Sequence, residues 1–367
     1  GKAALQYSTT EGYLPLRELL CRHVERYGIK VTPANVLVTG GSQQALDLIG
    51  KLMINPGDRV LTEAPTYLGA LQAWSGYETR YLTVPLDDDG LRTDELEAQL
   101  RSGPKYLYIL PNFHNPGGTT MTLERRHRLV ELASHYGTPI LEDDPYGQLR
   151  FEGNHLPTLV EIDAQYHGAT TSEHPFRGGV MYLGTLSKTL APGLRIGWVV
   201  APEAVIQKLV QIKQGADLHT ATFTQMVAHS YFTSEDWRGQ VGQLLEIYRS
   251  RRDAMLSALE EHLSGIAEWT HPEGGLFVWV ILPDFIKASE MLAAALDAKV
   301  AYVPGDGFYP HRGGENCMRL NFSYSDIETI HEGIKRLAKV VKRETSLAGS
   351  LGFRVPRPGE APPHDEQ

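Results

Sequence analysis

The chain has 367 residues, of which 42% are hydrophobic and 22% charged, and a formal net charge of -9. This composition indicates a globular protein with a large core, and the length predicts two domains. The negative charge gives no support for binding to nucleic acid or to an anionic membrane surface, because both attract basic patches. A small-molecule partner is therefore expected.

Cys21 and Cys317 are the two cysteines of the chain, and they form no CxxC pattern. The sequence therefore predicts neither a disulfide framework nor a cysteine metal site, as is typical of a reducing compartment. No apolar run reaches the roughly 18 residues of a membrane helix, and no basic segment followed by an apolar one opens the chain. These features predict a cytoplasmic protein with no metal and no membrane partner.

From about residue 35, short apolar runs alternate with helical patterns, which is typical of parallel α/β folds. Strands are expected at 35–40, 58–65, 79–85, 105–111, 138–144, 180–186 and 195–202. Helices are expected between several of them, at 41–53, 66–76, 92–102 and 122–137. The pattern predicts a doubly wound sheet, whose ligands lie beyond the carboxyl ends of the strands.

After Pro202 the pattern becomes helical, and an amphipathic helix over 236–263 is expected to connect to a smaller α+β domain. Its expected elements are strands at 274–282, 301–305 and 317–324 and helices at 288–299 and 326–344. The expected organisation is an N-terminal arm at 1–30, a large domain at 31–235, the connecting helix, a small domain at 264–345 and a disordered tail at 346–367.

One lysine, Lys188, lies in "GTLSKTLAPGLRIG" (184–197), where the strand over 180–186 ends. Thr185 and Ser187 offer hydroxyl groups beside it, and Arg195 offers a positive charge. A lysine that forms a Schiff base, beside hydroxyls and an arginine that hold a phosphate, is the arrangement that pyridoxal phosphate requires. Taken alone, "LSKT" favours an ordinary loop lysine.

The run "TPILEDDPYGQ" (138–148) ends a buried strand with Glu142, Asp143 and Asp144. Buried carboxylates are rare unless paired, so at least one is expected to meet a cation. A pyridinium nitrogen is such a cation, and an aspartate there keeps the ring protonated. Metal binding is the competing use of acidic triplets, although no histidine pattern lies nearby.

The stretch "LPNFHNPGG" (110–118) ends another strand with a loop in which Asn115 could donate to the ring oxygen O3′, beside the Tyr146 hydroxyl. Pro116 is a candidate for a cis peptide that would aim the asparagine. Asn-Pro-Gly-Gly is also a common turn.

"VLVTGGSQQALDL" (36–48) indicates a strand, a glycine turn and a helix. The backbone N–H groups of Gly41, Ser42 and Gln43 could hold a phosphate at the helix start. The pattern is neither GxGxxG nor GxxxxGK[ST], which disfavours dinucleotide and P-loop sites. Helix capping by Ser42 is an equally good interpretation. In "CMRLNFSY" (317–324), Arg319 alternates with the apolar Met318 and Leu320, so its side chain is expected to point away from the small-domain core. It could clamp a substrate carboxylate, although a plain exposed strand arginine is more common.

Together these motifs resemble the class I/II pyridoxal-phosphate-dependent aminotransferases of fold type I, over roughly residues 7 to 340. The likeness is nearest to the subgroup containing 2-aminoadipate aminotransferase. It is carried by "YSTTEGYLPLR", "TGGSQQALDL", "EAPTYLGA", "PNFHNPGG", "EDDPYGQLRF", "GTLSKTLAPGLRIGW", "KQGADLHT", "PEGGLFVWV" and "GENCMRLNFS" in this order. The resemblance implies an α/β fold with a mostly parallel seven-stranded sheet, plus a smaller α+β domain.

The resemblance also implies roles for the residues. Lys188 would bind the cofactor covalently and move a proton between the substrate's Cα and the cofactor, Asp143 would contact the ring nitrogen, and Tyr67 would stack on the ring. The remaining implied contacts are Asn115 and Tyr146 with O3′, Arg319 and Asn115 with the substrate, and Gly41, Ser42, Gln43, Thr185, Ser187 and Arg195 with the phosphate. Tyr7 would reach the phosphate of a partner subunit, so a homodimer with shared active sites is implied.

Members of this family have several dozen residues before the position that matches Gly1, including a helix that covers the substrate. The resemblance therefore implies that the 1–30 arm is truncated, and it does not indicate which amino acid is the donor. The implied activity is amino-group transfer between an L-amino acid and a 2-oxo acid, with 2-oxoglutarate as acceptor, in amino acid metabolism. Two alternatives remain: a ligand-sensing domain of a transcription regulator, and β-elimination on the same scaffold.

Overall fold

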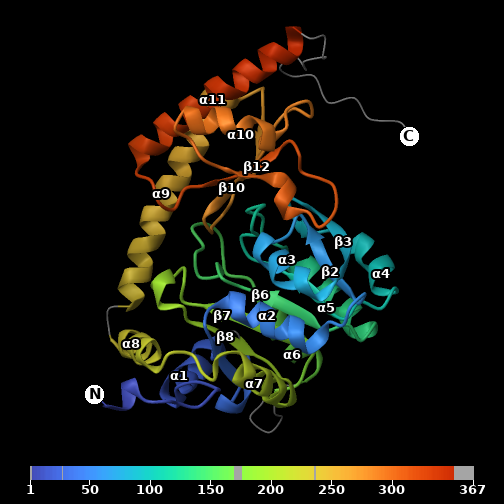
Figure 1. Ribbon diagram of the computed structural model, residues 1–367, viewed down its shortest axis with the longest axis vertical. Helices are drawn as coiled ribbons and strands as arrows, with labels where there is room; N and C mark the ends of the chain where they lie inside the picture. The colour runs from blue at the N-terminus through green and yellow to red at the C-terminus, as the bar shows by residue number, and fades with distance from the viewer. Residues whose placement is uncertain (1, 27, 169–175, 235–236, 351–367) are drawn as a thin grey trace.

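The computed structural model describes residues 2–26, 28–168, 176–234 and 237–350, and Figure 1 shows its two domains joined by the long helix α9 (Trp237–Leu263). The large sheet has the strand order β1-β8-β7-β6-β5-β2-β3-β4. These strands are Val36–Thr39, Gly197–Val200, Val180–Thr185, Ile140–Asp143, Leu107–Ile109, Arg59–Ala64, Arg80–Asp87 and Gly90–Leu91. The seven strands predicted from the sequence are all present, and the two-residue β4 is an eighth that the prediction missed.

The direction of the strands brings several carboxyl ends to one edge of the sheet. Strands β7, β6, β5, β2 and β3 are parallel neighbours. Strand β8 runs antiparallel to both β7 and β1, so β1 runs in the same direction as the parallel set. The residues after β1, β2, β5, β6 and β7 therefore meet at the same edge, where a doubly wound sheet binds its ligands.

Helices cover both faces of this sheet. One face packs against α1 (Leu14–Glu25), α4 (Thr93–Leu100), α5 (Leu123–His135), α6 (Leu159–Tyr166) and α8 (Thr222–Thr233). The other packs against α2 (Ser42–Met53), α3 (Leu68–Trp74) and α7 (Glu203–Asp217). Within β1, Val36 and Val38 face the first layer and Leu37 faces the second, as the alternation of side chains along a strand requires.

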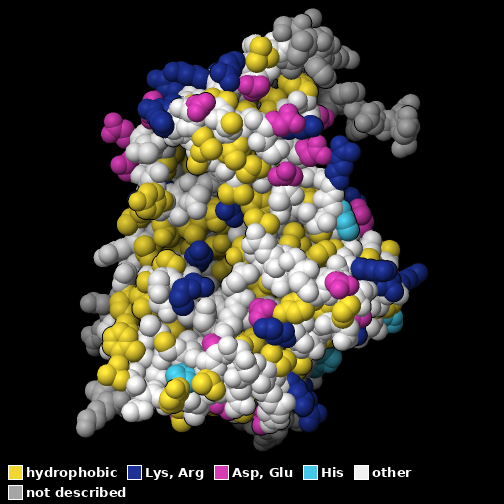
Figure 2. All heavy atoms as spheres, in the orientation of Figure 1, with side chains coloured by type: hydrophobic (Ala, Val, Ile, Leu, Met, Phe, Trp, Pro, Cys, Tyr) yellow, Lys and Arg dark blue, Asp and Glu magenta, His cyan; other side chains and the backbone are white. Residues whose placement is uncertain are grey.

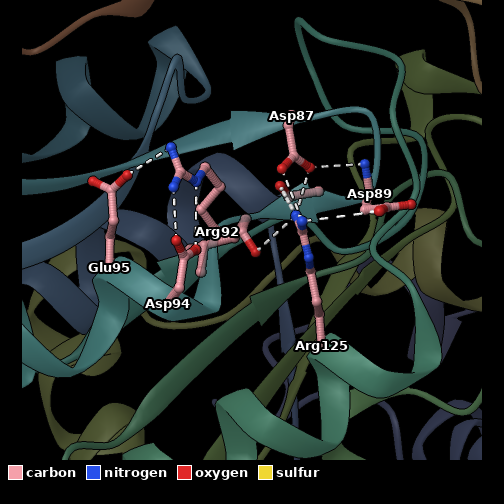
Figure 3. A network of polar contacts seen from close by, with 8 residues as sticks. Asp87, Asp89, Arg92, Asp94, Glu95 and Arg125 are labelled. Carbon is pink, nitrogen blue, oxygen red and sulfur yellow. Dashed lines mark hydrogen bonds and ion pairs between the residues drawn. The ribbon is translucent and has the colours of Figure 1, made fainter.

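The missed strand β4 forms a short hairpin with β3. Figure 3 shows Arg125 reaching from α5 to this hairpin, where it donates to Asp87 over 2.8 Å and to the carbonyl of Gly90 over 2.8 Å. Arg92 pairs nearby with Asp94 and Glu95. These are partly exposed ion pairs, which contribute little to stability.

The small domain follows α9 and contains the sheet β11-β12-β10-β9. Its elements are β9 (Glu268–Trp269), β10 (Phe277–Ile281), α10 (Ala288–Asp297), β11 (Val303–Pro304), β12 (Cys317–Asn321) and α11 (Ile327–Ser350). Apolar side chains of α9, α10, α11, β10 and β12 form a separate core. Helix α11 includes 346–350, the first residues of the expected tail, and the rest of that tail lies outside the described residues.

Within the described part of the chain, no helix combines the length and the apolar character needed to cross a membrane. The same residues contain no group of three or more His, Cys, Asp or Glu side chains placed to hold a metal ion.

Candidate active site

A cavity of about 390 Å³ lies at the carboxyl edge of the large sheet, where the small domain approaches it. Figure 2 shows a hollow between the two domains, lined largely by hydrophobic side chains with a few basic groups on its wall. The predicted site residues that line the cavity are Ser42, Gln43, Tyr67, Asn115, Asp143, Tyr146, Thr185, Ser187, Lys188, Arg195 and Arg319. A larger cavity, of about 910 Å³, lies near Arg22, Gln148 and Trp237 and contains none of them.

Lys188 follows β7 and points its amine into the cavity, half-buried beside two arginines. Burial lowers the pKa of Lys188, and the positive charges of Arg319 and Arg195 lower it further. Both effects favour the neutral amine, which is the form that attacks a carbonyl or accepts a proton. Lys188 therefore differs from the ordinary loop lysine that "LSKT" alone would favour.

Asp143 ends β6 with its side chain almost completely buried. Its Oδ2 accepts a hydrogen bond of 2.8 Å from the Tyr108 hydroxyl, and its Oδ1 is buried with no hydrogen-bond partner among the described residues. Burial raises the pKa of Asp143 to about 7, against the opposing effect of the Tyr108 hydrogen bond. A cationic donor at the free oxygen would satisfy this carboxylate.

The two acidic neighbours of Asp143 point to the opposite side of the sheet, as strand alternation dictates. Glu142 accepts from the backbone N–H groups of Leu159 and Val160, 2.8 Å away each, at the start of α6. Asp144 accepts from the Asn112 amide and the Tyr182 hydroxyl. Only the middle carboxylate of the triplet therefore faces the cavity.

Asn115 lies in the loop after β5 and connects two of the predicted residues. Its peptide bond to Pro116 is cis, as the sequence suggested. Its amide donates weakly to the Tyr146 hydroxyl at 3.4 Å, and its Oδ1 accepts from Arg319 at 2.7 Å. Burial raises the pKa of Tyr146 above its ordinary value, so its hydroxyl stays protonated and can donate.

Arg319 lies on β12 and crosses from the small domain into the cavity. Its guanidinium stacks over Phe277 at 4.1 Å and Phe308 at 5.1 Å from the ring centroids. Its Nε is buried, and no described residue forms a hydrogen bond with it. The flanking Met318 and Leu320 are buried in the small-domain core, so the predicted alternation is correct. A guanidinium with a free donor in a cavity is suited to a carboxylate.

Hydrogen-bond donors also gather around the turn after β1. Gly41 has φ +94°, and a Cβ on it would come within 2.4 Å of Nη2 of Arg195. Gly41 itself caps α2, and Ser42 is its first residue, with a buried hydroxyl that has no hydrogen-bond partner within the described ranges. Ser42 therefore does not cap the helix through its side chain, and the first-turn N–H groups of Ser42 and Gln43 have no intrahelical acceptor.

Thr185 and Ser187 complete this donor cluster from the β7 side. The Thr185 hydroxyl donates to Ser187 Oγ at 3.0 Å and accepts from the Ser187 backbone N–H at 3.1 Å. Arg195, in the left-handed region with φ +51°, reaches Ser187 Oγ at 3.5 Å. Backbone N–H groups, hydroxyls and a guanidinium around one point form a binding site for a phosphate dianion.

Of the two remaining predicted tyrosines, Tyr67 lines the cavity and Tyr7 does not. Tyr67 precedes α3 and lines the cavity, where burial and the charge of Asp143 raise its pKa. Tyr7 does not line it: its side chain is 83% exposed and contacts the ring of His219 edge-on. The single chain therefore brings together every predicted site residue except Tyr7.

Sequence reasoning missed Tyr108 and Phe277, which support Asp143 and Arg319 respectively. Tyr108 lies on β5, the strand beside β6, and Leu110, two residues further on, lines the cavity. That spacing was a usable signal, because residues i and i+2 of a strand share a face. Phe277 carried no comparable signal, since an aromatic residue in an apolar strand is normally core.

The donors fit a phosphorylated pyridine with an aldehyde. The phosphate matches the cluster around Gly41, the ring nitrogen matches the unpartnered Oδ1 of Asp143, and the aldehyde matches the amine of Lys188. The unpartnered hydroxyl of Ser42 is one more buried group that this molecule would satisfy.

Comparison with known proteins agrees with this site. The model of the family "Aminotransferase class I and II" matches residues 1–337. Aromatic-amino-acid aminotransferase 1 of Thermococcus litoralis is 47% identical over 93% of this chain and 81% of its own. The α-aminoadipate aminotransferase structure of Thermus thermophilus, complexed with N-(5′-phosphopyridoxyl)-L-leucine, has a TM-score of 0.87 and 42% identity, over 94% of this chain and 85% of its own.

A transcriptional regulator is also similar. The uncharacterized HTH-type regulator YdfD of Bacillus subtilis is 33% identical over 94% of this chain and 68% of its own. The family match nevertheless spans nearly the whole described fold, and the more similar relative named above is an aminotransferase. This chain belongs to the class I and II aminotransferase family, with the fold-type I architecture and pyridoxal 5′-phosphate as its cofactor.

Proposed function

We propose that the chain transfers an amino group from an L-amino acid to a 2-oxo acid, with 2-oxoglutarate as acceptor, in two successive half-reactions at the cavity described above. The observation that carries this proposal is the meeting of Lys188, Asp143 and Arg319 in one cavity from three separate parts of the sequence. A reactive amine, a buried carboxylate and a free guanidinium are the groups that amino-group transfer on an α-amino acid needs.

The bound cofactor supplies an aldehyde that can take up an amino group and a ring that accepts electrons when the substrate's Cα loses its proton. Asp143 holds a proton on the ring nitrogen through its free Oδ1, because a carboxylate beside that nitrogen favours the charged ring. Asn115 and Tyr146 donate to the ring oxygen, and Tyr67 packs on the ring. Together they fix the ring's orientation.

Lys188 acts as the base and acid at Cα. Its lowered pKa favours a neutral amine, which would remove the proton from the substrate's Cα and then give a proton to C4′, the aldehyde carbon of the cofactor. The neighbouring arginines, Arg195 and Arg319, contribute to this lowering of the pKa. They therefore favour the neutral form of Lys188 in addition to binding anions.

Arg319 binds the substrate's α-carboxylate. Its guanidinium is held flat between Phe277 and Phe308 and is oriented by Asn115, which leaves Nε and the remaining donors for a bidentate pair. The phosphate is held by the cluster of Gly41, Ser42, Gln43, Thr185, Ser187 and Arg195. Two different groups of donors in the cavity would thus hold two different anions.

The active unit is proposed to be a homodimer whose active sites are shared. Exposed apolar side chains lie near the start of the chain and on α8: Leu5, Tyr7, Leu14, Phe223 and Val227. Such a surface suits burial against a second copy. Tyr7, exposed on this surface, would then reach the phosphate of the partner subunit.

We propose that the remaining expectations also hold: a domain division at 1–30, 31–235, 236–263 and 264–345, a cytoplasmic location and a role in amino acid metabolism. Both cysteines are buried free thiols, which supports a reducing compartment. The relatives' names support an α-amino acid donor, and donors with aromatic and with acidic side chains both belong among the candidates.

A second candidate function is a ligand-sensing domain that binds the cofactor without turnover. The similarity to the YdfD regulator favours it. Steady-state transamination separates the two: the wild type should form glutamate from 2-oxoglutarate with at least one amino acid, and Lys188→Ala should not. Lys208→Ala, on the exposed side of α7, is the control and should match the wild type.

A further inference from the structure

One lysine that this mechanism does not use is completely buried. Lys213 lies on α7, and its side chain has no exposed surface. Its Nζ donates to both carboxylate oxygens of Asp217 at 2.7 Å and to Oε1 of Gln44 at 2.9 Å. A buried ammonium is costly unless its hydrogen bonds are satisfied, and these partners come from two helices.

Gln44 extends this contact to the turn between β1 and α2. Its Oε1 also accepts from the backbone N–H of Gly40 at 2.7 Å, and its Nε2 donates to Asp217 at 2.7 Å. Both the oxygen and the nitrogen of the side-chain amide are therefore hydrogen-bonded. Exchanging their positions by flipping the amide would break these bonds, so one orientation satisfies all the partners. Gln44 is locked between α7 and the turn.

The same turn holds the phosphate donors. The carbonyl of Gly40 accepts from Nη2 of Arg195 at 3.4 Å, and a Cβ on Gly41 would reach within 2.4 Å of that Nη2. Displacing the Gly40 peptide would therefore move the Gly41 and Ser42 amides and also remove a contact that orients Arg195.

Charge adds to this geometry. Lys213 and Asp217 form an ion pair, so their opposite charges largely cancel and produce little net electrostatic potential at the turn. Without the ammonium, the Asp217 carboxylate would remain beside the turn and repel a phosphate dianion. Loss of the lysine therefore weakens phosphate binding through position and through charge.

We propose that Lys213 and Gln44 are positioning residues for the cofactor's phosphate, holding the 40–42 turn and Arg195 in the geometry that binds it. The proposal rests on the proposed function, because it places the phosphate at that turn. It predicts an effect confined to phosphorylated ligands.

The test compares pyridoxal 5′-phosphate with pyridoxal, which lacks the phosphate, as ligands of Lys213→Met, Gln44→Met and the wild type. Absorbance titration of the cofactor-free protein should give a dissociation constant for pyridoxal 5′-phosphate at least about tenfold higher in each variant, a difference of about 1.4 kcal/mol. The constant for pyridoxal should stay within about twofold of the wild type, since a twofold change is under 0.5 kcal/mol. Lys208→Met, on the exposed side of the same helix, should change neither constant.

Equal weakening of both ligands, or no weakening of either, would overturn the proposal and leave Lys213 a purely structural residue. Gln44→Met is the second variant in case Lys213→Met does not fold, because it removes the same link and leaves the ion pair in place. Failure of the proposed function has a different signature: the wild type would bind pyridoxal 5′-phosphate with the normal phosphate preference and still transfer no amino group.

Discussion

The hydroxyl of Tyr108 donates to one oxygen of Asp143, and the other oxygen of the same buried carboxylate has no hydrogen-bond partner in the part of the chain that the structure describes. The tyrosine thereby fixes which oxygen faces the cavity. It also lowers the pKa of Asp143 relative to what burial alone would give. A residue that sequence reasoning missed thus controls the group proposed to meet the cofactor's ring nitrogen.

Replacing Tyr108 with Phe should move the acid limb of the activity profile to higher pH. The hydrogen bond favours the ionised carboxylate, so its loss raises the pKa of Asp143, and protonated Asp143 cannot hold the charged ring. A charge-assisted hydrogen bond of about 1.5 kcal/mol corresponds to a shift of about one pH unit. The measurement is kcat/KM against pH, with Tyr106→Phe, another buried tyrosine near this strand, as control. A shift to lower pH would contradict the role given to Tyr108.

Replacing Arg319 with Met should lower kcat/KM for the amino acid by about 10- to 100-fold, because the substitution removes a hydrogen-bonded pair of opposite charges. Most of the loss should appear in KM, because the carboxylate is held in ground state and transition state alike. Arg312→Met is a matched control, since Arg312 is a largely exposed arginine of the same domain. If Arg319→Met instead left KM unchanged, the carboxylate would have to bind elsewhere.

Replacing Gly41 with Ala should weaken pyridoxal 5′-phosphate binding by about tenfold or more, since the added methyl displaces Arg195 and the strained turn shifts. Gly57→Ala is the control, because Gly57 also has positive φ but has open space around its Cβ position. Both variants should lose about 1 kcal/mol of stability from backbone strain, and only Gly41→Ala should lose cofactor affinity. If Gly41→Ala and Gly57→Ala bound pyridoxal 5′-phosphate with equal affinity, the turn would not be what holds the phosphate.

Replacing Phe223 with Asp should convert the proposed dimer to monomer. The wild type should have twice the mass of the chain in light scattering, and the charge should disrupt the apolar surface near Tyr7. Ile327→Asp, at a comparably exposed apolar position on α11, should leave the dimer intact. A monomeric wild type, or a dimer that survives Phe223→Asp, would place the interface elsewhere or remove it.

Much of the site could be predicted because parallel strands deliver their last residues to one edge. Asp143 and Lys188 lie in or just after strands that are recognisable from apolar runs, so their proximity follows from the topology. Alternation along β12 likewise directed Arg319 away from the small-domain core.

The contacts that orient these groups could not be read from the sequence. Lys213 meets Gln44 across 169 residues, and Tyr108 meets Asp143 from a neighbouring strand, so both contacts depend on packing that no local pattern encodes. Strand β4 was missed because a strand of two residues is too short to show the alternation of apolar and polar side chains by which strands are recognised. Tyr7 shows the remaining limit: its expected partner belongs to a second copy of the chain.

The most direct test of the central claim is the absorbance spectrum of the cofactor-loaded protein on addition of an amino acid without any 2-oxo acid. The panel should include glutamate, 2-aminoadipate and the aromatic amino acids. We predict that at least one of them abolishes the visible band of the bound cofactor, and that 2-oxoglutarate then restores it. A visible band that no amino acid changes, in protein that binds the cofactor normally, would contradict amino-group transfer and favour a ligand-sensing domain.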